Sequence, residues 1–160
     1  MTDAERWRRL QAEQAEWAQR NFGDAPAWQP LMGIGEGLGE FYEAAGQPEE
    51  DDAIGDVCVC ALDYCTRMGW DMAEIVGLDA YAPVHDSGGS ILLGRLNHAH
   101  LKQAQGIRGN EDHEAKGKEA LAGLLQWLNY GDDLLDIAED VWSLVKQRDW
   151  KASAKTGVTP

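Results

Sequence analysis

Two groups of carboxylates occur at spacings that place each group on one face of a helix. Glu36, Glu40 and Glu43 follow one another at intervals of four and three residues, and Asp52 and Asp56 are four apart. Like charges stacked in this way repel one another unless they are solvated or share a cation. Oxygen ligands with no histidine or thiolate among them suit Mg²⁺ or Mn²⁺. The five carboxylates are therefore candidate ligands of a divalent cation.

The alternative is a solvated acidic face, which is the commoner fate of a charge run. The placement of these carboxylates favours a metal, because the segments GEGLGE and DAIGD adjoin residues that we predict to be buried. A di-iron site of the ferritin type would need Glu-x-x-His pairs. None of the four histidines has a Glu three positions before it, and no CxxC motif or Cys/His spacing indicates zinc.

Charge and composition narrow the classes of protein that fit. A formal net charge of −14 argues against a nucleic-acid-binding protein, which needs a basic surface to displace counterions. The three cysteines fall within eight residues of one apolar run, which predicts buried thiols in a reducing compartment. The polar N-terminal segment lacks the pattern of a signal peptide, and no apolar run has membrane-spanning length. We expect a cytoplasmic protein without membrane or nucleic-acid partners.

The elements that must position the carboxylates are helices. Strand signals are nearly absent, and Ala, Leu, Glu, Gln and Asp dominate between the turn residues. The pattern predicts an all-α helical bundle, a single domain over residues 1–160. The predicted helices cover residues 3–20, 31–45, 50–68, 71–76, 90–105, 114–129 and 132–148. The loop between the second and third helices is short, so these two should pack antiparallel and bring their acidic faces together.

The chain also has features of an internal duplication. The segment GLDAYAPVHDSGG lacks periodicity and is the best internal boundary. On either side of it a long helix opens with an apolar step into glycine, and DMAEIV on one side matches DIAEDV on the other. We predict a first helical half over residues 21–78, a related and degenerate half over 88–150, and a flexible tail over 151–160.

At these residues the sequence resembles the MazG-like, all-α nucleoside triphosphate pyrophosphohydrolases, in particular a phage and bacterial branch. The family motif is an EExxE helix followed by an ExxD helix, and here the two elements read EGLGE and AIGD. The flanking segments NFGDAPAWQPLMG, HAHLKQAQGIRG and VKQRDW extend the resemblance over nearly the whole chain. Gly37 replaces the second Glu of EExxE and Ala53 replaces the Glu of ExxD. Glu43 and Asp52 are nearby acids that could take over.

The same comparison indicates what the second half has lost and kept. Ile91, Leu92 and Arg95 stand where the acids of EExxE would be, Gly123 stands at the position of Asp56, and only Glu119 stays acidic. The segment HAHLK and an Ile-Arg loop, which carry basic residues in this branch, occur only in this half. This division suggests that the two halves complement each other across one site.

The resemblance implies a Mg²⁺-dependent enzyme that cleaves a nucleoside triphosphate to a monophosphate and pyrophosphate. Glu36 and Glu40 would be both metal ligands and catalytic groups, one of them acting on the attacking water. Lys102 and Arg108, and Arg95 if it points inward, would neutralise the phosphates. The alternative for each basic residue is a surface ion pair.

Recognition of the base is less defined by the sequence. Trp28 is the aromatic candidate for a stacking wall, with Asn97 and His98 as possible polar contacts, although His98 fits a surface position equally well. The resemblance implies a deoxynucleotide substrate such as dGTP only by analogy. We also expect a homodimer. The alternatives are an all-α dUTPase-like hydrolase and a non-catalytic acidic helical interaction protein.

Overall fold

The computed structural model describes residues 1–107, 109–129 and 131–158. These residues form helices and no strands, which confirms the predicted all-α class. In chain order the helices are α1 (Asp3–Phe22), α2 (Trp28–Glu43), α3 (Gln47–Met68), α4 (Met72–Val76), α5 (Gly88–Gln105), α6 (His113–Leu128) and α7 (Leu134–Val145). None of the helices in the described ranges combines the length and the apolar character needed to cross a bilayer.

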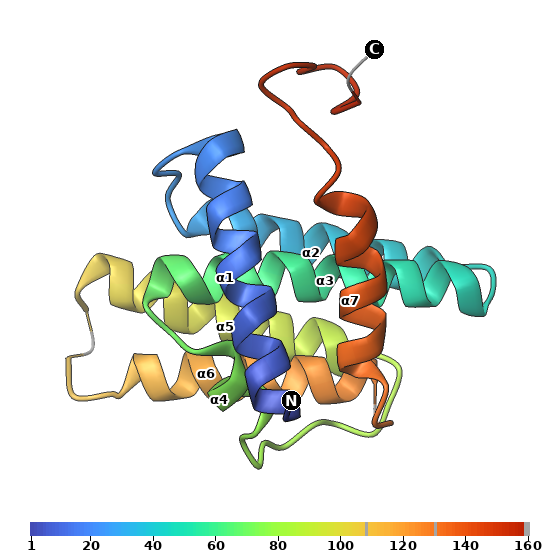
Figure 1. Ribbon diagram of the computed structural model, residues 1–160. Helices are drawn as coiled ribbons and strands as arrows, with labels where there is room; N and C mark the ends of the chain where they lie inside the picture. Colours follow the sequence, from blue (N-terminus) through green and yellow to red (C-terminus); the bar gives the residue numbers. More distant parts are fainter. Residues whose placement is uncertain (108, 130, 159–160) are drawn as a thin grey trace. The chain divides into compact units, whose positions relative to one another are not determined.

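The chain divides into two compact units (Figure 1). Unit 1 comprises residues 1–72 and 133–160, and unit 2 comprises residues 73–132. The boundaries differ from the halves expected from the sequence, because residues 133–150 cluster with the first unit. Each unit contains one antiparallel helical hairpin, α2–α3 in unit 1 and α5–α6 in unit 2. Descent of the two hairpins from a duplication stays a prediction.

In unit 1, α2 and α3 pack closely because small residues line their contact. Pro48 lies in the first turn of α3, where its missing N–H and fixed φ are tolerated. A Cβ atom added to Gly33 would lie 2.7 Å from the Sγ atom of Cys60. The same addition at Gly37 would lie 2.7 Å from Cγ2 of Val57. These two glycines, four residues apart on α2, therefore allow its backbone to approach α3.

The helices α1 and α7 run across α3 rather than along it (Figure 1). Gly55 of α3 lies against Val141 of α7, where an added Cβ atom would lie 2.1 Å from a Val141 methyl group. Nearer the start of α7, Asp136 and Glu139 accept hydrogen bonds from Arg6 of α1. This packing of α7 on α3 explains why residues 133–150 belong to unit 1.

Unit 2 is held together by leucines between α5 and α6. Leu92 and Leu96 of α5 and Leu121 of α6 are fully buried. The segment before α5 is fixed by Trp127, whose indole N–H donates to the backbone oxygen of His85 at 3.0 Å. The hairpin thus has an apolar interior of its own.

The segment after α7 forms hydrogen-bonded turns over residues 149–157. The Asp149 amide donates to the backbone oxygen of Gly157 at 2.8 Å, and the Trp150 amide donates to the Asn21 side chain at 2.7 Å. Trp150 is thereby attached to the end of α1. Flexibility of residues 151–160 stays a prediction, and residues 159–160 lie outside the described ranges.

Candidate functional site

Unit 1 contains a cavity of about 530 Å³ among its helices. Its wall is formed by α1, the loop that follows it, α2, α3, and the segment at the end of α7. Among the described residues, the charged side chains in this wall are Glu36, Glu40, Asp56, Asp63, Arg67 and Arg148. Four carboxylates and two guanidinium groups leave the wall with a formal charge of −2 when all are ionised.

Three of the five predicted metal ligands, Glu36, Glu40 and Asp56, lie in the wall of this cavity. The packing of α2 on α3 explains their convergence. Gly37 and Ala53 are both buried in the contact between the two helices. A Glu side chain at either position would have to displace α3 or α2. The small size of these two residues therefore allows close packing, and Glu36, Glu40 and Asp56 line the cavity beside the contact.

The carboxyl group of Asp56 has an unusual environment. Its pKa is raised from 3.8 to about 6, first by burial and then by the negative charges of Glu40 and Asp52. Arg148 acts in the opposite direction through its positive charge. Burial and like charges oppose ionisation of this carboxyl group, so a bound cation would stabilise its ionised form near neutral pH. Cys60 also borders the cavity, but burial raises the pKa of its thiol to about 12, so it stays protonated and is a poor metal ligand.

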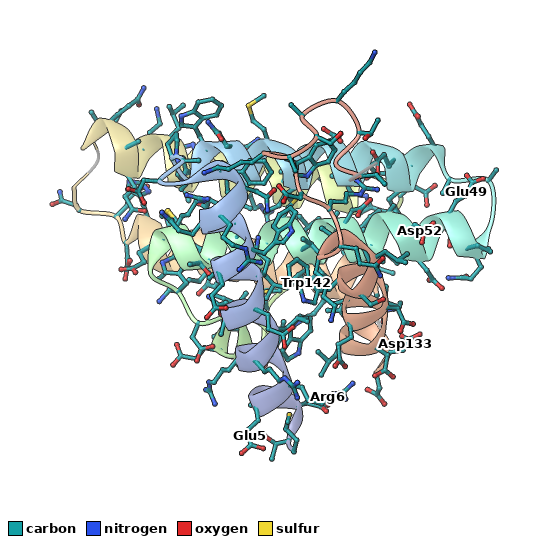
Figure 2. The ribbon with its side chains drawn as sticks, turned by 45° about the horizontal axis from the view of Figure 1, so that its top comes forward. Glu5, Arg6, Glu49, Asp52, Asp133 and Trp142 are labelled. Carbon is teal, nitrogen blue, oxygen red and sulfur yellow. The ribbon has the colours of Figure 1, made fainter. Side chains whose placement is uncertain are left out.

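The other two predicted ligands lie outside the cavity wall. Asp52 is exposed, one turn before Asp56 on α3 and close to Glu49 at the start of that helix (Figure 2). It affects Asp56 through its charge. Glu43 is exposed at the last residue of α2. Three of the five acids thus belong to the cavity wall, where Glu36 and Glu40 are exposed at its surface and Asp56 is half-buried, and two lie outside it.

Asp63 and Arg67 form a shielded ion pair at another part of the wall. The Arg67 Nε atom donates to the Asp63 carboxylate at 2.8 Å, and both side chains are largely buried. Arg67 also donates to the backbone oxygens of Gly23 and Ala25. The pair thus holds the loop between α1 and α2 in place. Since its donors are engaged in this way, Arg67 is a positioning residue for the wall.

The side chain of Arg148 is less constrained than that of Arg67. Its guanidinium carbon lies 5.7 Å from the centre of the Trp150 ring, which is within the range of a cation–π contact. The Arg148 backbone oxygen accepts a hydrogen bond from the indole N–H of Trp17 at 2.9 Å. Its backbone is therefore anchored while its side chain lines the cavity together with Trp150. It is the cation of the wall best able to meet an anionic ligand.

The remaining predicted residues lie elsewhere in the chain. Trp28 is exposed at the start of α2 and is not part of the cavity wall. On α5, Arg95 and His98 line a separate cavity of about 400 Å³ within unit 2, together with Glu119 of α6. The other residues predicted on α5 are the exposed Asn97 and the half-buried Lys102, and Arg108 lies outside the described residues. A shared site for the two halves stays a prediction.

Sequence reasoning missed Asp63, Arg148 and Trp150 as components of the wall. The signal for Asp63 was available, because Asp56, Cys60 and Asp63 are spaced four and three residues apart on one helix face. No local pattern could have located Arg148 and Trp150, since α7 and the following turns reach the cavity only through tertiary packing. No protein-family model, curated protein or solved structure matches this chain.

Proposed function

We propose that this protein is a Mg²⁺- or Mn²⁺-dependent nucleoside triphosphate pyrophosphohydrolase with its carboxylate centre in unit 1. One observation carries the proposal: Glu36, Glu40 and Asp56 line the same cavity, and the pKa of Asp56 is raised by its burial there and by the charges of neighbouring acids. Carboxylates that repel one another in a partly enclosed space are suited to a hard divalent cation. The nucleotide substrate and the scissile bond come from the resemblance to MazG-like enzymes.

The donor set fits such a cation. Glu36, Glu40 and Asp56 offer carboxylate oxygens, and the neighbouring Cys60 thiol is too weakly acidic to compete. These three residues would hold the ion, with Asp52 affecting its affinity through charge. A bound Mg²⁺ supplies Lewis-acid polarisation of the phosphoryl oxygens and neutralises their charge. Three protein carboxylates leave room for the phosphates and for water, as Mg²⁺ sites commonly do.

The chain's own residues have separable roles in this reaction. A glutamate oxygen that the ion leaves unengaged accepts a proton from the attacking water. The water oxygen forms a bond to phosphorus while the bridging P–O bond between the α- and β-phosphates breaks, and its electron pair stays with the leaving phosphate. Arg148 neutralises the growing charge on that phosphate. The Trp150 ring keeps the guanidinium group at the cavity wall.

The test is a product assay on the full chain with each common NTP and dNTP, with Mg²⁺ and with Mn²⁺. We expect a monophosphate and pyrophosphate from at least one nucleotide, and no reaction with EDTA. Absence of hydrolysis with both metals would overturn the enzyme proposal and favour a non-catalytic protein. A diphosphate with orthophosphate would instead show that the scissile bond is wrongly assigned. Exclusive cleavage of dUTP would favour the dUTPase-like alternative.

A further inference from the structure

A second group of potential metal ligands lies in unit 2 and plays no part in the proposed hydrolysis. It consists of His98 on α5, Glu111 in the segment between α5 and α6, and His113 at the first position of α6. One ligand atom from each residue can be chosen so that all three lie within 4.8 Å of one another. Three residues from three consecutive elements of one hairpin therefore converge on a single point.

His113 is the residue that needs an explanation. Its side chain is only 7 % exposed, and neither ring nitrogen has a hydrogen-bond partner among the described residues. Buried polar atoms in folded proteins are nearly always paired, because leaving one unpaired costs on the order of 1–3 kcal/mol. The Nδ1 atom lies 3.8 Å from the Glu111 carboxylate, too far for a hydrogen bond. The ring makes an edge-on contact with the ring of His98, with the two ring centres 6.2 Å apart.

We infer that His98, Glu111 and His113 form a binding site for a zinc-like transition-metal ion. Two imidazoles and one carboxylate are a borderline donor set that favours Zn²⁺ and its neighbours over Mg²⁺. In tetrahedral zinc sites the ligand atoms are roughly 3.3 Å apart, a separation that follows from bonds of about 2.0–2.1 Å. The present separations, at most 4.8 Å, exceed that value, so binding requires the side chains to move closer together. The fourth position is left for water or an external ligand.

The surroundings fit this assignment. Asp112, between two of the ligands, caps α6 by accepting a hydrogen bond from the Ala115 amide at 2.9 Å, which fixes the backbone at this point. Lys116 pairs with Glu111 at 3.5 Å, but its side chain is exposed and can move away when a cation binds. His98 also lines the cavity of unit 2, which gives the ion an entry path. A bound ion would cross-link α5, the connecting segment and α6.

The test uses the untagged full chain, stripped with EDTA and titrated with Co²⁺, whose visible spectrum distinguishes four-coordinate from six-coordinate sites. We expect one four-coordinate Co²⁺ per chain, displaced by Zn²⁺. His98→Ala and Glu111→Gln, which change exposed residues and should fold, are expected to weaken Co²⁺ binding at least about tenfold, since even outer-shell changes cost that much. The matched control His100→Ala, also on α5, should bind as the unchanged protein does.

A further variant, in the carboxylate centre of unit 1, shows which of the two sites binds the ion. Glu40→Gln should keep the four-coordinate spectrum, because an all-oxygen site gives the weaker six-coordinate one. Loss of the signal in Glu40→Gln would place the ion in unit 1 and overturn the inference. The inference also fails if the unchanged protein shows no four-coordinate spectrum, or if His98→Ala and Glu111→Gln both retain it. None of these results depends on hydrolytic activity.

Discussion

Gly37 of α2 lies directly against Val57 of α3, and a Cβ atom added to the glycine would lie 2.7 Å from a Val57 methyl group. Because Val57 is fully buried and β-branched, its methyl groups have little room to rotate away. The contact sets how closely the two acidic helices approach. It thereby sets the separation between the glutamates of α2 and Asp56 of α3.

The first prediction follows from this contact. Gly37→Ala should lower the free energy of unfolding, because overpacking costs about 1–3 kcal/mol and exceeds the ~1 kcal/mol gained in helix propensity. Gly39→Ala is the matched control on the same helix, where an added Cβ atom meets nothing within 4 Å. It should stabilise the protein by about 0.5–1 kcal/mol. Urea unfolding of both variants is the measurement, and equal effects would contradict the role of Gly37.

The second prediction distinguishes the carboxylates of the cavity wall from those outside it. Glu40→Gln removes a proposed metal ligand in the cavity wall and should abolish both turnover and the rise in melting temperature expected with Mg²⁺. Glu43→Gln removes the same charge one turn later on α2, outside the cavity wall, and should have a small effect on both. Thermal melts with and without Mg²⁺ and initial rates measure these effects. A Glu43→Gln variant as impaired as Glu40→Gln would mean that the site extends beyond the cavity.

The third prediction concerns pH. The pKa of Asp56 is about 6 in the folded protein against 3.8 as its ordinary value, so the folded state binds the proton more tightly. The stability contributed by this proton is complete below pH 3.8 and is lost as the pH rises through about 6. The Asp56→Asn variant has no carboxyl group at this position, so it does not lose this stability as the pH rises. In EDTA it should be more stable than the unchanged protein at pH 7.5, by about 1 kcal/mol after allowance for solvent screening of a half-buried group.

The same comparison at pH 4 is the control for this prediction. Asp56 is then mostly protonated in the folded protein, so the two proteins should differ much less in stability. Urea unfolding at both pH values gives the required difference. A gain in stability that is equal at the two pH values would show that Asp56→Asn acts through packing and not through charge.

The fourth prediction tests Arg148 as the phosphate contact. Arg148→Gln should lower kcat/KM by at least about tenfold, since a charge-assisted hydrogen bond contributes about 1.5–3 kcal/mol. Binding of Mg²⁺ without nucleotide should not weaken, because removal of this cation relieves repulsion of the metal. Lys151→Gln removes the same charge three residues later, outside the cavity wall, and serves as the control. Equal rates for the two variants would remove Arg148 from the mechanism.

Much of the fold could be predicted from local pattern. The predicted helices match the observed ones closely, because each depends on spacing, on turn residues such as Pro48 and on glycines at the ends. The start of α2 was placed too late, since AWQP appears loop-like in sequence while Trp28 and Gln29 are helical. The grouping of the helices was less predictable. Packing of α7 on α3 depends on Gly55 and Val141, which are far apart in the chain.

The candidate sites divide in the same way. The spacing of Glu36 and Glu40 on α2, and of Asp52 and Asp56 on α3, is a property of helical periodicity, so the sequence by itself determined which acids share a helix face. Only the tertiary structure decided which of the acids enter the cavity, because that depends on the close packing allowed by Gly37. It alone brought Arg148 to the same wall and His98 to His113, since their meeting depends on long-range packing that no local spacing encodes.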